Sequence, residues 1–213
     1  VLSLKDMNRL NHLEALLDVG ITSFKIEGRL KDVSYVTNVC AAYRQTLDAL
    51  IEKKGLLRAS QGKSFIDFEP DLNKTFNRDY TPYFLQGREK NMACFETPKS
   101  KGEVLGPVVS LDAESITLKT SKELNPGDGL CFFNPSGVLQ GTSVHRVEEN
   151  RIFVNSVEGI GQGTLIYRNY DHEFEKKLAA RLPERKVGVN PHFFETEQGF
   201  AFTLKDEEGL EVT

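Results

Sequence analysis

Residues 101–170 constrain the fold most, because six short β-prone runs alternate there with turn residues. Turn sequences such as Asn125-Pro126-Gly127-Asp128 separate the runs, and their backbone preferences suit tight reversals. Strands this short at such regular spacing predict a small antiparallel β-barrel, with His145 on one of its strands. The runs are Glu103 to Leu111, Ser115 to Thr120, Gly129 to Phe133, Val138 to Val147, Arg151 to Ser156 and Thr164 to Arg168.

Residues 1–58 have a different pattern, in which helical and β periods alternate. Ser3 and Asp6 loosely match a helix capping box, leucines recur at helical spacing over residues 4–18, and a second helix is expected from Val33 to Ile51. Between them, Ile21 to Ile26 alternates at period two, which predicts a strand. This order predicts a parallel sheet and the last βα portion of a (β/α)8-type barrel, whose full form needs roughly 250 residues.

The whole chain is therefore expected to have an α+β fold in four parts. Residues 1–58 form the α/β part, 59–100 an aromatic-rich connecting segment held by aromatic burial, and 101–170 the small barrel. Residues 171–213 form a linker helix and the start of a further β-containing domain. Within this last part, we expect a helix from His172 to Arg181 and strands at Lys186 to Val189, Phe200 to Lys205 and Leu210 to Thr213.

The composition excludes several classes of protein. Of 213 residues, 39% are hydrophobic and 27% are charged, and no apolar run approaches the about 20 residues that would span a bilayer. A net charge of -4 argues against a bulk nucleic-acid binder, although a local basic patch stays open. Three scattered cysteines argue against a disulfide framework, so we expect a reducing, cytoplasmic location and no membrane partner.

The histidines and cysteines give no catalytic or metal-binding pattern. His12, His145, His172 and His192 are isolated from one another in the sequence, which predicts no metal site. Cys40 falls on the expected buried stripe of its helix, and Cys131 lies in a β run. Both are expected to be small core residues rather than nucleophiles.

The most informative stretch for chemistry is Lys25-Ile26-Glu27-Gly28-Arg29-Leu30-Lys31. It lies where a barrel strand would end and its βα loop begin, which is where such barrels place their sites. Lys25, Glu27 and Arg29 are the candidate catalytic residues, and Arg29 suits an anion or carboxylate. The alternative is a salt-bridged end of a core strand, and the two interpretations stay open.

A second candidate is Phe76-Asn77-Arg78-Asp79-Tyr80-Thr81. An exposed Arg78 between aromatic residues suits a phosphate or a base. The structural interpretation, in which Arg78 pairs with Asp79 beneath an aromatic plug, is favoured on sequence grounds alone.

The chain also resembles a known family. Ser3-Leu4-Lys5-Asp6, the Lys25 to Lys31 stretch, Tyr35-Val36, Ala42-Tyr43-Arg44 and Phe76-Asn77-Arg78 resemble, in order and spacing, the collagenase-like peptidase family U32. The resemblance covers residues 1 to about 90. It extends more loosely to the barrel, which is similar to the elongation-factor-Tu-like second domain of these proteins.

This resemblance implies two activities for a longer parent protein. The family is classed as peptidases, some of them collagenases, and several bacterial members act instead in tRNA or rRNA hydroxylation with an iron–sulfur cluster. That cluster is held by four cysteines upstream of the Ser-Leu-Lys-Asp motif, so none is expected in this chain. The matching motifs make Tyr43, Arg44, Asn77, Arg78 and Tyr80 candidates for binding a peptide or RNA substrate.

Both ends of the chain lie within expected elements, because it opens on Val1 in a helical pattern and closes on Leu210 to Thr213 in a strand. We therefore expect a C-terminal fragment of a long family member, itself catalytically silent. The alternative function is a binding or structural module for RNA or protein. The Ile21 to Ile26 strand would lack its parallel neighbours, so it is expected to pair with residues 63–68 or with another copy of the chain.

Overall fold

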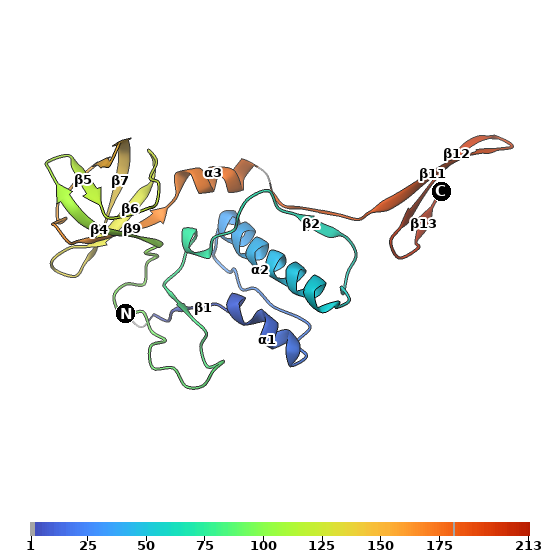
Figure 1. Cartoon of the computed structure of the whole chain (residues 1–213), viewed down its shortest axis with the longest axis horizontal. Coiled ribbons are helices and arrows are strands. Elements are labelled where there is room, and N and C mark those ends of the chain that lie inside the picture. Colours follow the sequence, from blue (N-terminus) through green and yellow to red (C-terminus); the bar gives the residue numbers. More distant parts are fainter. Residues whose placement is uncertain (1–2, 181) are drawn as a thin grey trace.

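The computed structural model describes residues 3–180 and 182–213 (Figure 1). The chain begins with two short helices beside one long helix, passes through an irregular segment into a closed barrel, and leaves the barrel through helix α3 towards a separate small sheet (Figure 1). Among the described residues, no helix is long and apolar enough to cross a membrane.

The helical part consists of a 3-10 turn η1 (Leu10–His12), α1 (Leu13–Asp18) and α2 (Val33–Lys54). The Asp32 carboxylate caps α2 by accepting a hydrogen bond from the Tyr35 amide at 2.7 Å. Leu13 is fully buried, and Lys54 near the end of α2 binds Asp18 of α1 at 2.6 Å. The two helices therefore pack side by side, as Figure 1 shows.

The first expected helix begins later than its leucine spacing predicts. Residues Asp6–Met7 form strand β1, which pairs in parallel with β3 (Tyr80–Thr81). The Lys5 amide donates to the Met92 carbonyl at 2.9 Å. The expectation of a helix from residue 4 is wrong because this backbone takes its hydrogen-bond partners from residues 79–92.

The expected strand at Ile21 to Ile26 is wrong. Residues 21–28 have no regular secondary structure, and Ile21 and Ile26 are exposed. Alternation of side chains selects the faces of a strand, but a strand forms only where another backbone accepts and donates its hydrogen bonds. The expected partner is also wrong, because β2 (Lys63–Phe65) pairs antiparallel with β10 (Glu184–Lys186) instead.

The connecting segment is irregular, as expected, with β2, the 3-10 turn η2 (Leu72–Lys74) and β3 as its short elements. Its aromatic side chains divide into two groups. Phe68, Phe76 and Tyr80 are partly buried, and the Phe68 ring meets Phe174 of α3 edge-on at 6.3 Å. Aromatic burial is wrong for four others, which are exposed: Phe65, Tyr83, Phe84 and Phe95.

Residues 103–170 form a closed antiparallel barrel of six strands, which confirms the predicted small barrel. The strands follow the order β4-β5-β8-β7-β6-β9 around it. His145 lies on β7, as predicted. The strands are β4 (Glu103–Leu111), β5 (Ser115–Leu118), β6 (Gly129–Phe133), β7 (Leu139–Glu148), β8 (Arg151–Val154) and β9 (Leu165–Tyr170).

The barrel interior holds the main core of the molecule. Ile116 and Ile166 are fully buried, and Leu130 and Phe132 of β6 are almost so. These residues point inward on successive strands, and closure leaves the barrel without a free edge.

Helix α3 (His172–Ala180) leaves the barrel with Phe174 and Leu178 buried. The end expected at Arg181 lies outside the described residues. The strand expected at Lys186 to Val189 is wrong, because the backbone there divides between β10 and β11 (Val189–Thr196). The other two expected strands correspond to β12 (Gly199–Asp206) and β13 (Glu211–Val212), which complete the sheet β11-β12-β13 at the far end of Figure 1.

Candidate functional site

A cavity of about 510 Å³ lies between strand β1, helix α2 and the irregular residues 23–31. Charged and aromatic side chains make up most of its wall. Six of the eight residues singled out in the sequence line it: Lys25, Glu27, Arg29, Tyr43, Arg78 and Tyr80. The structure thus brings together residues that are more than 50 positions apart in the chain.

The two remaining candidates, Arg44 and Asn77, do not line this cavity. Arg44 binds Asp48 one helical turn further along α2, with Nη2 to Oδ1 at 2.5 Å. Asn77 is 4% exposed, and its Nδ2 donates to the backbone carbonyl of Thr75 at 3.0 Å. Both side chains are engaged in local contacts, so their part in substrate binding stays a prediction.

Arg78 is held against Asp6 at the cavity wall. Its Nη2 donates to Asp6 Oδ1 at 2.8 Å, and its backbone amide donates to Asp6 Oδ2 at 2.8 Å. Hydrogen bonding to the Asp6 carboxylate raises the pKa of Arg78 above its ordinary value. The sequence interpretation that paired Arg78 with Asp79 is replaced by this pair, while Asp79 binds Lys101 at 3.0 Å.

Two tyrosines of the wall are fixed through their hydroxyl groups. The Tyr43 hydroxyl accepts from the Arg9 amide at 2.9 Å, and the Tyr80 hydroxyl donates to the Leu72 carbonyl at 2.6 Å. Burial raises the pKa of Tyr80 well above its ordinary value. Both rings are therefore fixed parts of the wall, and the Tyr80 hydroxyl stays neutral.

Lys31 lies over the ring of Phe76, with Nζ at 3.1 Å from the ring centre. Burial lowers the pKa of Lys31, the Asp6 carboxylate opposes that shift, and the nearby Arg78 adds to it. This arrangement gives the cavity a cation that is partly stripped of water.

Sequence reasoning missed three residues of this site. Asp6 had been interpreted as part of a helix cap, and Arg9 carried no signal at all. Lys31 belongs to the charged stretch that predicted the site, but its position in the sequence did not make it a candidate site residue. Only the pairing of β1 with β3 places Asp6 and Arg9 beside the residues from the later segments.

Lys25 and Glu27 form an exposed ion pair, with Nζ and Oε2 separated by 3.7 Å. Their side chains are 88% and 70% exposed, so water weakens the attraction. Among the residues that line the cavity there is neither histidine nor cysteine. The lining does include Ser23 and two carboxylates, Asp6 and Glu27.

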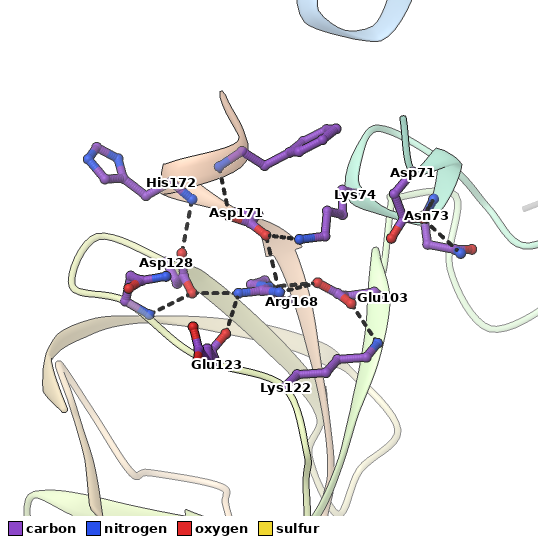
Figure 2. A network of polar contacts seen from close by, with 12 residues as sticks. Asp71, Asn73, Lys74, Glu103, Lys122, Glu123, Asp128, Arg168, Asp171 and His172 are labelled. Carbon is purple, nitrogen blue, oxygen red and sulfur yellow. Dashed lines mark hydrogen bonds and ion pairs between the residues drawn. The ribbon is translucent and has the colours of Figure 1, made fainter. Parts of the chain in front are cut away.

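A second polar cluster joins the barrel to α3 and η2, as Figure 2 shows. Arg168 at its centre is 4% exposed and contacts Glu103, Asp128 and Asp171. Lys74 of η2 donates to Asp171 at 2.6 Å. These charges satisfy one another, so the cluster is a structural joint that fixes the start of α3 on the barrel.

The cysteines do not fit an iron–sulfur cluster, which needs four thiolates around one centre. Cys94 is buried and donates to the Thr97 carbonyl at 3.1 Å, and Cys131 is buried in the barrel. Cys40 is exposed, so its expected burial is wrong, because α2 buries the face of Asn38, Ala41 and Ala42. Among the described residues, no group of three or more His, Cys, Asp or Glu side chains could hold a metal ion.

The N-terminal part of the chain, which holds the cavity, is also the part that matches a known family. Residues 1–93 match the family described as Peptidase family U32. The chain is 36% identical over its whole length to the 23S rRNA 5-hydroxycytidine C2501 synthase of Escherichia coli (strain K12), of which it covers 34%. No solved structure matches the chain.

Two further relatives have names of different kinds. The chain is 35% identical to a collagenase of Porphyromonas gingivalis (strain ATCC BAA-308 / W83), over 78% of the chain and 40% of that protein. It is 25% identical to the tRNA hydroxylation protein P of Escherichia coli (strain K12), over 90% of the chain and 42% of that protein. Residues 1–93 of the chain are thus similar to peptidase family U32, and the whole chain spans between about a third and two fifths of these relatives.

Proposed function

We propose that this chain is the substrate-binding part of an RNA-hydroxylating member of peptidase family U32, and that it has no catalytic activity alone. The observation that carries the proposal is the 36% identity, over the whole chain, to a protein named as an rRNA 5-hydroxycytidine synthase. Three relatives named as tRNA hydroxylation proteins support the same class of substrate.

The cavity suits a binding role in such a protein. Its wall combines five Lys and Arg side chains with two carboxylates and three tyrosines, which suits an anionic ligand with flat rings. The redox step of a hydroxylation would depend on groups supplied by the rest of the complete protein. An iron–sulfur cluster there would need cysteines outside this chain, since the three present do not converge.

The test uses the complete protein in its own cells. Deletion of its gene should remove a hydroxylated pyrimidine from rRNA or tRNA, measured by mass spectrometry of digested RNA. The complete gene should restore the modification, and a version with Arg78→Gln should restore less than a tenth of it. Unchanged RNA modification after the deletion would overturn the proposal.

A second candidate function is proteolysis, which the 35% identity to a protein named collagenase favours. The purified chain should leave gelatin intact, because its cavity wall lacks histidine and cysteine. If the purified chain cleaves gelatin and Glu27→Gln abolishes that cleavage, the proposed lack of catalytic activity is wrong and the peptidase function is supported.

A further inference from the structure

The carboxylates of the cavity wall are already paired, whereas most of its cations are not. Asp6 is held by Arg78 at 2.8 Å, and Glu27 lies 3.7 Å from Lys25. Among the described residues, no carboxylate lies within 4.0 Å of the charged nitrogens of three other wall residues: Arg9, Arg29 and Lys31. The cavity therefore has three positive charges without a counter-charge from the protein.

Arg9 gives a second, independent sign of a missing partner. Its Nη1 is buried and has no hydrogen-bond acceptor, although its side chain lines the cavity. A buried donor without an acceptor destabilises a folded protein, so such groups are rare unless a ligand completes them. An acceptor bound in the cavity would satisfy this nitrogen once the guanidinium rotates, because the buried Nη1 does not itself face the open space.

The surroundings of Lys31 indicate that the ligand is negatively charged. Burial lowers its pKa, with Asp6 opposing and Arg78 adding to the shift, so its charged form is disfavoured. An anion beside Lys31 would reverse this penalty by direct attraction. The Phe76 ring, 3.1 Å from Nζ, keeps the ammonium in place.

The rest of the wall is suited to a flat, partly apolar group. Tyr35, Tyr43 and Tyr80 line it, together with the apolar Val39 and Leu72. A volume of about 510 Å³ lies within the range of ordinary ligand sites. A bare phosphate or a small dicarboxylate would use the cations but leave this aromatic side uncovered.

We infer that the cavity binds one nucleotide of a single-stranded RNA, with its phosphate at Arg9, Arg29 and Lys31 and its base against the tyrosine side. This inference rests on the proposed function and names the chemistry of its ligand. Arginine and lysine donate to phosphate oxygens in charge-assisted hydrogen bonds, and aromatic rings stack on unpaired bases. The acidic character of the whole chain does not oppose it, since residues 1–100 have 15 Lys and Arg against 13 Asp and Glu.

The experiment measures binding of a fluorescein-labelled single-stranded RNA of about 10 nucleotides to the chain of residues 1–213, by fluorescence anisotropy. Arg9→Gln, Arg29→Gln and Lys31→Gln should each weaken binding about tenfold at low salt. Because the three side chains share one phosphate, each substitution should reduce the slope of log K against log salt by at most about 0.7, the value for that one phosphate contact on a single strand. The matched control is Arg88→Gln, an exposed residue outside the cavity, which should bind as the unchanged chain does.

Two further measurements distinguish binding of a nucleotide in the cavity from a general attraction between opposite charges. Cytidine monophosphate should displace the RNA at a lower concentration than inorganic phosphate, because it also covers the tyrosine side. Lys31→Arg should retain binding, and the circular dichroism spectrum of each variant should match that of the unchanged chain. If another variant loses its fold, the Arg29→Gln variant decides the test, because the Arg29 side chain is exposed and its replacement should leave the fold intact.

Absence of RNA binding, or equal binding by the cavity variants and Arg88→Gln, would overturn the inference. Equal displacement by cytidine monophosphate and phosphate would overturn the assignment of a nucleotide. These outcomes are independent of the proposed function, because they are measured without catalysis. A complete protein that binds RNA through these residues but hydroxylates none would overturn only the proposed function.

Discussion

Arg168 on the last strand of the barrel donates from Nη1 to Oδ2 of Asp128 at 2.9 Å, in a place where the side chains are 4% and 0% exposed. The same guanidinium also binds Glu103 and Asp171, as Figure 2 shows. Hydrogen bonds to Asp128 and Glu103 outweigh burial and raise the pKa of Arg168, so it stays charged. One cation thus contacts three carboxylates where the barrel meets α3, and Lys74 and Lys122 supply the further positive charges at Asp171 and Glu103.

Replacement of Arg168 by methionine should destabilise the fold by about 3–5 kcal/mol, because it leaves buried carboxylates without their cation. Urea denaturation followed by circular dichroism measures this loss. The control is Arg151→Met, since Arg151 and Asp112 form an ion pair with side chains about half exposed, whose loss should change stability by less than about 1 kcal/mol. Equal losses in the two variants would contradict the buried cluster.

The stability of the fold should fall as the pH is lowered from about 5 to about 3. Burial by itself raises the pKa of Glu103, but hydrogen bonds from Lys122 and Arg168 hold it below its ordinary value. The pKa of Asp171 is lowered in the same way, against burial, by Lys74 and the Phe174 amide. The unfolded chain therefore takes up protons first, so this stabilisation is complete above the unfolded pKa and is lost as the pH falls through the folded one.

The free energy of unfolding at several pH values measures this dependence. Glu103→Gln should show a shallower dependence than the unchanged chain, and the exposed Glu158→Gln should leave it unchanged. A steeper dependence in Glu103→Gln would show that other carboxylates control acid unfolding.

Gly102 and Gly137 have nearly the same backbone angle, with φ of +73° and +74°, but different surroundings. A Cβ at Gly102 would lie 1.9 Å from the Arg168 carbonyl oxygen, whereas at Gly137 nothing lies within 4 Å. Gly102→Ala should destabilise by about 3 kcal/mol or more, and Gly137→Ala by about 1 kcal/mol. Urea denaturation of the two variants makes the comparison, and similar losses would place the chain at Gly102 farther from β9.

One thiol of the native chain should react quickly with a thiol reagent such as dithiobisnitrobenzoate, and three should react after denaturation. Cys40 is exposed, whereas Cys94 and Cys131 are buried, and burial raises the pKa of Cys131 to about 11. The Cys40→Ser variant should therefore show no fast reaction. The absorbance of the chromophore released by the reagent measures this. Two or more fast thiols in the native chain would contradict the burial of Cys94 or of Cys131.

The sequence by itself determined the barrel. Its runs are short, its turn residues are specific, and three of its six strand pairings join strands next to each other in sequence, so local patterning predicts the strands within one or two residues at most of their ends. The charged stretch from Lys25 to Lys31 likewise predicted one side of the cavity, because four charged residues occur there within seven positions.

Only the tertiary structure decided the rest. Ile21 to Ile26 has the alternation of a strand but no pairing strand among the described residues, and Asp6 leaves its expected cap to bind Arg78, 72 positions away. Both outcomes depend on which distant segment supplies the hydrogen bonds, and a periodic pattern contains no information about that segment. The cavity is built in the same way, since its lining comes from three separate segments of the chain, residues 6–9, 23–43 and 72–80.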